Sequence, residues 1–281
     1  MKQIFKTTVL LSVLTGLFMA VGYMVGGRSG ALLALGVAGV MNFGMFWFSS
    51  TLVLKMQKAV PLDEKQHANI VRIVRELTQA DNLPMPKLYI VDTPIPNAFA
   101  TGRSPKHAAV AVTTGILDIL NDNELRAVLG HELGHVKNRD MLVSTIAATV
   151  AGAISFIAEM AFWSSLFTGG DEDSPNPIAA IAMIILAPIS AMLIQSAISR
   201  SREFLADQHG AKLVHGGQDL SSALEKLENF KQQVPPIQPS PTQQAQAHMM
   251  FANMFSAQGL AGLFSTHPST ADRVARLKKF N

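Results

Sequence analysis

The sequence predicts a mainly α membrane protein, with four transmembrane helices plus a cytoplasmic α+β domain that contains a small β-sheet. Three observations support this fold class. Four stretches are apolar over a length that can cross a bilayer, for which about 20 residues are needed. Basic residues gather at the borders of these stretches. The segments between them carry the helical and strand patterns of a folded domain in water.

The chain is rich in apolar residues and poor in charge. Hydrophobic residues make up 48% of the 281 residues and charged residues only 15%, whereas an average soluble domain carries about 25% charged residues. Buried helices of a large soluble protein are an alternative, but runs this long and poor in charge are unusual in water. We place the four spans at Thr7–Tyr23, Ala31–Leu54, Met141–Phe167 and Ile178–Ile198.

The first span is also compatible with a cleaved signal peptide, because Lys2 and Lys6 precede a short apolar run. The glycine-rich turn "GGRSG" and a second apolar run follow immediately. This order favours a retained helical hairpin.

The basic residues at the borders of the spans predict the topology. Only Arg28 lies in the first turn between spans, and the second turn, "TGGDEDSPNP", is acidic and contains no Lys or Arg. By the positive-inside rule, both termini and the segment after the second span are cytoplasmic. The flanking basic residues are Lys2, Lys6, Lys55, Lys58, Lys137, Arg139, Arg200 and Arg202.

This topology divides the chain into two hairpins and one split domain. The hairpins occupy residues 1–57 and 141–198, and the two parts of the cytoplasmic domain occupy residues 58–140 and 199–281. The net charge of +3 is small and dispersed, which excludes nucleic acid as the expected partner.

The cytoplasmic segments show helical and strand patterns in turn. Apolar residues at helical spacing predict helices over residues 67–82, 123–140, 199–214, 218–232 and 269–280. Short runs bounded by Pro, Gly and Asp predict strands within 86–93, 97–102 and 107–115. The proline-rich segment 232–246 predicts a mobile loop.

The segment "HELGH" predicts a metal site on a helix. His131 and His135 are four residues apart, so both imidazoles project from one helical face. Zinc accepts neutral imidazole and keeps an open position for water in catalytic sites. Glu132, next to the first histidine, is then placed to take a proton from that water. The alternative is an ordinary helix with two surface histidines.

Gly134 lies between the two histidines and permits close approach of another element. That element must bring a third ligand, because the chain contains no cysteine and has Asn138 and Met141 where a directly following histidine motif needs Gly and His.

The segment "EFLAD" supplies the candidate third ligand. Glu203 and Asp207 are one helical turn apart on one face. Glu203 is expected to bind zinc, while Asp207 accepts the free ring N–H of a zinc-bound histidine. His209 and His215 are rival ligands. Alternatively, Glu203 is an exposed acid paired with a neighbouring arginine, a pairing that contributes little free energy.

Two predicted spans lie between His135 and Glu203, and two crossings return the chain to the side that it left. The predicted site therefore lies at the cytoplasmic membrane surface, where a membrane protein presents its loops or ends.

Three motifs in this order resemble a known family. "HELGH", "SRSREFLAD" and "STHPSTADR", with two hydrophobic hairpins in these places, are similar to the HtpX-type membrane zinc metalloproteases, relatives of the CAAX prenyl endoproteases. The resemblance covers essentially the whole chain. It implies a gluzincin-like catalytic domain, one zinc ion per chain, a location in the bacterial inner membrane, and proteolytic quality control of membrane proteins under stress.

The resemblance also gives a meaning to two further segments. "PNAFATG", with Asn97, Ala98 and Phe99, resembles an edge strand that pairs with substrate backbone; the alternative is a plain structural strand. His267 resembles a histidine that hydrogen-bonds the oxyanion, or else it is a loop histidine before the last helix. Arg273 is expected to orient His267 or to bind a substrate carboxylate.

Two other classes of protein compete with a protease. One is a four-span scaffold or transporter with a structural metal site, but such a site is normally closed by four protein ligands and has no need of Glu132. The other is a regulatory binding module, which predicts an extended surface motif.

Overall fold

The computed structural model describes residues 2–141, 143, 144, 147, 151, 154, 158, 177–233 and 267–280. The chain forms two compact units. The first comprises Met1–Phe46 and Val143–Ser201, and the second comprises Trp47–Leu142 and Arg202–Asn281. Most of the predicted third span and of the predicted loop at 232–246 lies outside the described residues.

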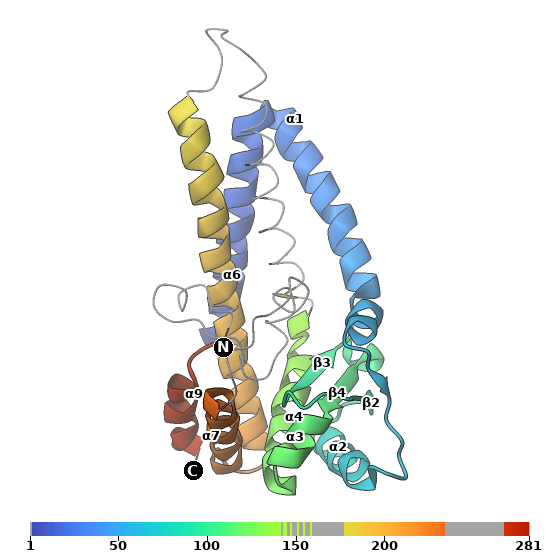
Figure 1. The fold of residues 1–281 in the computed structure, drawn as a ribbon. Helices are drawn as coiled ribbons and strands as arrows, with labels where there is room; N and C mark the ends of the chain where they lie inside the picture. Colours follow the sequence, from blue (N-terminus) through green and yellow to red (C-terminus); the bar gives the residue numbers. More distant parts are fainter. Residues whose placement is uncertain are drawn as a thin grey trace. The chain divides into compact units, whose positions relative to one another are not determined.

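The first unit is helical. Helix α1 (Lys2–Met56) is interrupted at Gly26 and Gly27, where the backbone leaves the helical region and Gly27 adopts a φ of 58°. Figure 1 shows the chain reversing direction there, as a glycine at positive φ permits. Across the ranges that the structure describes, no helix is both long and apolar enough to cross a membrane. The four spans therefore stay a prediction.

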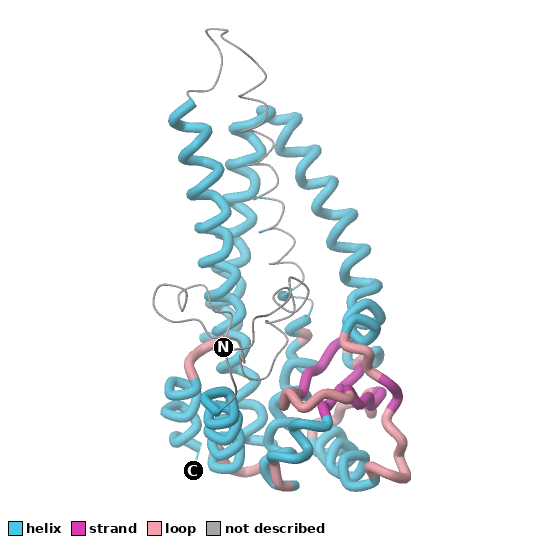
Figure 2. The backbone as a smooth tube through the Cα atoms, viewed as in Figure 1, coloured by secondary structure: helices cyan, strands magenta, loops and turns pink. Residues whose placement is uncertain are grey.

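The second unit contains a small mixed sheet. Its strands are β1 (Val60–Pro61), β2 (Lys87–Val91), β3 (Ala98–Thr101) and β4 (Ala109–Thr113), drawn in magenta in Figure 2. Their order is β1-β2-β4-β3, with β2 and β4 parallel and both outer pairs antiparallel. The sequence predicted β2, β3 and β4 but not β1, whose two residues are too few to show a pattern. Strand β3 lies at the edge of the sheet.

The second unit also contains helices, of which those at 114–119 and 122–138 contact the sheet. They are α2 (Ala68–Ala80), α3 (Thr114–Ile119), α4 (Asp122–Asn138), the second part of α6 (Pro177–Leu213), α7 (Gln218–Gln233) and α9 (Thr270–Leu277), with short 3₁₀ turns at Pro105–His107 and Lys278–Phe280. The predicted helix at 199–214 is thus the end of the longer α6. The apolar faces of α2, α4 and α7 form one buried core, which includes Ile70, Val74, Val128, Leu129, Leu224 and Leu227.

Helix α4 begins at a complete capping box. The Asn121 side chain accepts hydrogen bonds from the backbone N–H groups of Asn123 and Glu124, and the Glu124 carboxylate accepts from the backbone N–H of Asn121. Ser222 and Lys226 of α7 donate to the same carboxylate. The start of α4 is therefore fixed both locally and against α7.

Glycines bring α4 and α6 into backbone contact. A Cβ atom at Gly134 would lie 3.2 Å from the His209 side chain, and one at Gly210 would lie 2.8 Å from the backbone nitrogen of His131. The close approach expected at Gly134 is therefore present. The helices lie still closer at Gly210, where the added Cβ would meet backbone. This crossing brings Glu203 and Asp207 of α6 to the histidines of α4.

We predict that Gly210→Ala separates the two helices, because the new methyl group meets backbone rather than a movable side chain. Overpacking of this kind costs about 1–3 kcal/mol of stability. The variant should unfold at a lower denaturant concentration than the wild type, as monitored by tryptophan fluorescence. It should also bind less metal. Gly216→Ala is the control, since a Cβ there meets nothing within 4 Å. A Gly210→Ala protein with unchanged stability and metal content would show that the close crossing is dispensable.

Candidate metal centre

Three side chains present metal-binding atoms at one point. The Nε2 atoms of His131 and His135 lie 3.0 Å apart, and the Glu203 carboxylate lies 3.3 Å from His135 Nε2 and 3.8 Å from His131 Nε2. Donors bound to one metal at about 2.0–2.1 Å in tetrahedral geometry are about 3.3 Å apart. The spacing of these three donors therefore fits a single divalent cation.

Asp207 fixes the ring of His131. Its Oδ1 atom lies 2.9 Å from His131 Nδ1, and both side chains are buried. A carboxylate at this distance holds a proton on Nδ1 and leaves the lone pair on Nε2, which is the tautomer that a metal needs. This is the contact that the orienting role predicted for Asp207 requires.

Asp140 fixes the ring of His135 in the same way. Its Oδ2 atom lies 2.8 Å from His135 Nδ1, and its other oxygen pairs with the buried Arg202, which also donates to the Asn138 carbonyl at 2.9 Å. The sequence patterns assigned neither Asp140 nor Arg202 to the site. Helix α4 ends at Arg139 in the left-handed conformation, with a φ of 55°, so Asp140 follows a sharp change of direction that spacing alone does not reveal.

With a proton on each Nδ1, the two Nε2 lone pairs face each other at 3.0 Å. Two acceptors at this distance repel each other unless a positive charge lies between them. The carboxylate of Glu203 adds a further negative group beside them. Imidazole nitrogen and carboxylate oxygen are both zinc ligands, so this donor set suits a divalent metal cation.

Arg273 of α9 is buried and contacts the carboxylates of Asp207 and Glu203. Its guanidinium donates two hydrogen bonds to Asp207, at 2.9 and 2.7 Å, and lies 3.6 Å from Glu203. The side chain is only 2% exposed. The sequence analysis expected Arg273 to orient His267 or to bind a substrate carboxylate, whereas the structure places it on the acids behind the metal ligands.

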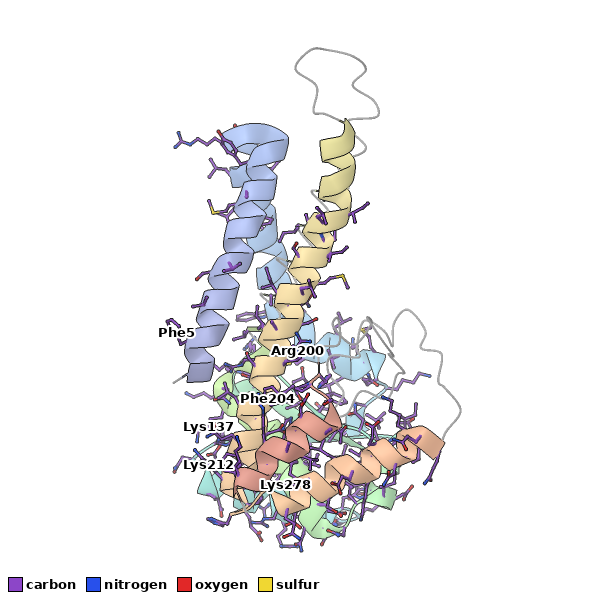
Figure 3. The ribbon with its side chains drawn as sticks, turned by 90° about the vertical axis from the view of Figure 1, so that its left-hand side faces the viewer. Phe5, Lys137, Arg200, Phe204, Lys212 and Lys278 are labelled. Carbon is purple, nitrogen blue, oxygen red and sulfur yellow. The ribbon has the colours of Figure 1, made fainter. Side chains whose placement is uncertain are left out.

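The position of α9 is fixed by a further contact. The Arg276 guanidinium lies 3.6 Å from the centre of the Phe204 ring, which follows Glu203 on α6 (Figure 3). A cation over an aromatic face is attracted by the ring. This contact and the Arg273–Asp207 pair hold α9 against the ligand-bearing part of α6.

The charges at the site set its protonation states. Burial lowers the pKa of His131 to about 4, so this ring is neutral at pH 7 and free to bind a metal. Burial raises the pKa of Glu203, but His267 and His135 outweigh it and hold that pKa well below its usual value. Glu203 is therefore an anion across the physiological range.

Glu132 differs from Glu203 in its environment. Burial raises the pKa of Glu132 to about 7, and the nearby Glu203 carboxylate adds to this rise. A carboxylate that exchanges a proton near neutral pH suits a general base. Its Oε2 atom accepts a hydrogen bond of 2.8 Å from the backbone N–H of Ala100 in β3, which holds the base against the edge strand.

The free edge of β3 faces the site. The Thr113 backbone N–H donates to the Asn97 carbonyl, and the Asn97 N–H donates to the Thr113 Oγ1, so Asn97 faces β4. The backbone groups of Ala98 and Ala100 then point the other way, as alternation along a strand requires. The side chains of Ala98 and Phe99 are buried, Phe99 against Val53 of α1. The observed link between this segment and the site is through the backbone of Ala100, which the sequence prediction did not include.

The remaining candidates separate into two groups. His267 joins the site, because its Nδ1 lies 3.1 Å from Glu203 and the residue is 7% exposed. His209 instead pairs with Asp81 at 2.8 Å, and His215 is exposed at the end of α6. The rival ligands are thus held elsewhere, and the 5% exposure of Glu203 rules out the reading of it as an exposed helix acid.

Together, the helical HExxH residues, the buried acid of a second helix and the edge strand define a metalloprotease site. The chain belongs to Peptidase family M48, whose sequence pattern matches residues 64–281. This membership favours the enzyme over the scaffold and binding-module readings.

Two relatives agree with this assignment, and one solved structure shares the fold. The chain is 49% identical over 274 residues to "Protease HtpX homolog" of Persephonella marina, covering 97% of this chain and 95% of that protein. It is 50% identical over 279 residues to the protein of that name from Syntrophobacter fumaroxidans, covering 98% of each. The crystal structure of S. mikatae Ste24p has the same fold, with a TM-score of 0.56 at 19% identity, covering 98% of this chain and 65% of that one.

We predict that Asp140→Asn and Asp207→Asn each weaken metal affinity by about 10- to 100-fold, since each acid only orients a ligand. The affinity is measured by titration with Zn²⁺. Asp81→Asn is the matched control, because Asp81 is also a buried acid bonded to a histidine, but that histidine is not a ligand. An Asp207→Asn protein with the wild-type dissociation constant would remove Asp207 from the site.

Proposed function

We propose that this chain is a zinc-dependent endopeptidase of the bacterial cytoplasmic membrane that cleaves misfolded membrane proteins. The observation that carries the proposal is the convergence of His131, His135 and Glu203 beside Glu132 and the free edge of β3. Two imidazoles and one carboxylate leave a fourth position open, as in catalytic zinc sites.

Zinc is the metal that these ligands suit best. Imidazole and carboxylate in tetrahedral arrangement are typical of Zn²⁺, while Mg²⁺ and Ca²⁺ prefer oxygen ligands alone. When bound, zinc lowers the pKa of a water molecule to about 7 and polarises the substrate carbonyl.

The protein supplies the remaining parts of the mechanism. Glu132 takes the proton of the attacking water and passes it to the leaving amine, a transfer suited to a carboxyl group with a pKa of about 7. Asp207 and Asp140 keep the imidazoles oriented. His267 lies beside Glu203, within the same buried cluster, and is the side chain that we propose to donate to the developing oxyanion.

Substrate recognition is proposed to rest on β3. The Ala98 N–H and C=O and the Ala100 C=O at the outer edge pair with an extended peptide of any sequence, in the manner of strand addition, while the Ala100 N–H holds Glu132. Such pairing suits an enzyme that removes many different damaged proteins, because backbone hydrogen bonds carry no sequence information.

Membrane location rests on the sequence. Four apolar runs, basic residues at their borders and two runs between His135 and Glu203 place the site on the cytoplasmic side, with both termini there. Substrates are then the cytoplasmic loops or ends of proteins in the same bilayer.

We predict that Glu132→Gln keeps metal and fold but loses cleavage. Glutamine still accepts the Ala100 hydrogen bond through its amide oxygen, but it cannot accept a proton. General base catalysis contributes about 10²- to 10⁴-fold, so activity on casein or on an unfolded membrane protein should fall by at least that factor at equal zinc content. Near wild-type activity would exclude Glu132 as the base, and inactivity of the zinc-loaded wild type would overturn the proposed function.

The predicted orientation is tested by single cysteines, because the chain has none of its own. Ser174→Cys should react with an impermeant thiol reagent added to intact cells, and Glu225→Cys, exposed on α7, only after the membrane is opened. Glu225 is preferred to its neighbour Ser222 as the cytoplasmic labelling position, because the Ser222 hydroxyl donates a hydrogen bond to Glu124. Labelling of Glu225→Cys from outside would invert the orientation, and labelling of both from one side would show that the predicted span Ile178–Ile198 between them does not cross the membrane.

A further inference from the structure

A pocket lies beside the candidate metal centre, between the end of β3 and the end of α4. It is a shallow pocket with an enclosed volume of about 10 Å³, room for about one water molecule, and the remaining space is open to solvent. Small residues line it on the strand side, Ala100, Gly102 and Ser104, and Val136, Arg139 and Met141 line it on the helix side. It lies within the second compact unit.

The pocket is continuous with the proposed reaction site. It shares the ligand His135 with the metal centre, and it shares Ala100, whose backbone bonds to Glu132, with the edge strand. A peptide that pairs with β3 and presents its scissile bond to Glu132 must therefore run past the pocket. Because strand residues advance by about 3.3 Å each, the side chain that reaches it belongs to a residue next to the scissile bond or one further along.

The shape of the pocket favours a side chain of modest size. Position 102 requires glycine, because its φ is 134° and a Cβ there would lie 2.3 Å from the His107 carbonyl oxygen. The loop is closed by a 3.0 Å contact between Ser104 and His107. The strand wall therefore consists of small residues, and a larger residue at position 102 does not fit.

The charge of the pocket favours neutral or acidic side chains. Arg139 is the charged lining residue besides the metal ligand His135. The charged residues on either side of Arg139 along the chain already have partners. Asp140 contacts both Arg202 and His135, and Lys137 pairs with Asp81. Arg139 is exposed and held at the C-cap of α4, where its backbone bonds to the carbonyls of His135 and Val136. Among the described residues no ion pair involves Arg139, so its positive charge is available to an incoming side chain.

We propose that this pocket is a specificity site, which accepts a small neutral or acidic substrate side chain beside the scissile bond and excludes Lys and Arg. The inference rests on the proposed endopeptidase function and adds a preference that backbone pairing with β3 does not supply. Arg139 determines the charge that is accepted, and the small residues of β3 and its loop limit the size.

The test is cleavage of a peptide library in which each position around one scissile bond is varied in turn, with products read by mass spectrometry. Wild-type, Arg139→Gln, Arg139→Glu and Lys212→Glu proteins are compared after loading with zinc. Lys212→Glu is the matched control, because Lys212 is an exposed cation on α6 that does not line the pocket (Figure 3). Metal content and Trp47 fluorescence show that each variant is folded.

We expect the wild type to cleave peptides with Ala, Ser or Glu at one position about fivefold faster, in kcat/KM, than peptides with Lys or Arg there, the size of effect that a partly exposed charge produces. Arg139→Gln should abolish the discrimination by charge and Arg139→Glu should reverse it, while Lys212→Glu keeps the wild-type pattern. Identical preferences in all four proteins would overturn the inference and leave the endopeptidase function intact. A wild type that cleaves no peptide would overturn both.

Discussion

The close crossing of α4 and α6 is the constraint on which the site depends. Gly210 brings the backbone of α6 against the backbone of His131, and Gly134 accepts Ala206 and His209 of the opposite helix. A side chain at either glycine would need space that this contact does not contain. Because the helices meet in this way, the Glu203 carboxylate on α6 reaches the imidazoles of α4. Asp207, one turn further along α6, reaches the opposite nitrogen of the His131 ring.

Burial then determines how the charges are arranged. Glu203, Asp207 and Asp140 are all nearly inaccessible to solvent, and an unpaired buried carboxylate is costly. Each has a cationic or hydrogen-bonding partner, with Arg273 on Asp207 and Arg202 on Asp140. The arginines come from α9 and α6, so helices distant in sequence stabilise the negative charge that the metal ligands need. The pair between Arg273 of α9 and Asp207 explains why α9, which supplies no ligand, is packed against the site.

The edge strand and the catalytic base are one structural unit. Ala100 bonds to Glu132 from the free edge of β3, and Phe99 anchors the other face of the strand in a small core with Val91 and Ala111. The base and the strand that we propose to bind substrate are thereby held in fixed register. The pocket at the end of β3 is part of the same arrangement, because its strand wall follows directly on Ala100.

The sequence by itself determined the local features of this protein. Helical spacing is enough to place His131 and His135 on one face and Glu203 and Asp207 on another, since periodicity is a property of neighbouring residues. The capping residues at Asn121, three of the strands and the metalloprotease motif followed in the same way. Only the tertiary structure decided which distant residues meet. Asp140 and Arg202 support His135 because the backbone turns at Arg139, Arg273 serves Asp207 because α9 packs on α6, and His209 is removed from the ligand set by Asp81. These contacts depend on the packing of whole helices, which no spacing within one segment records.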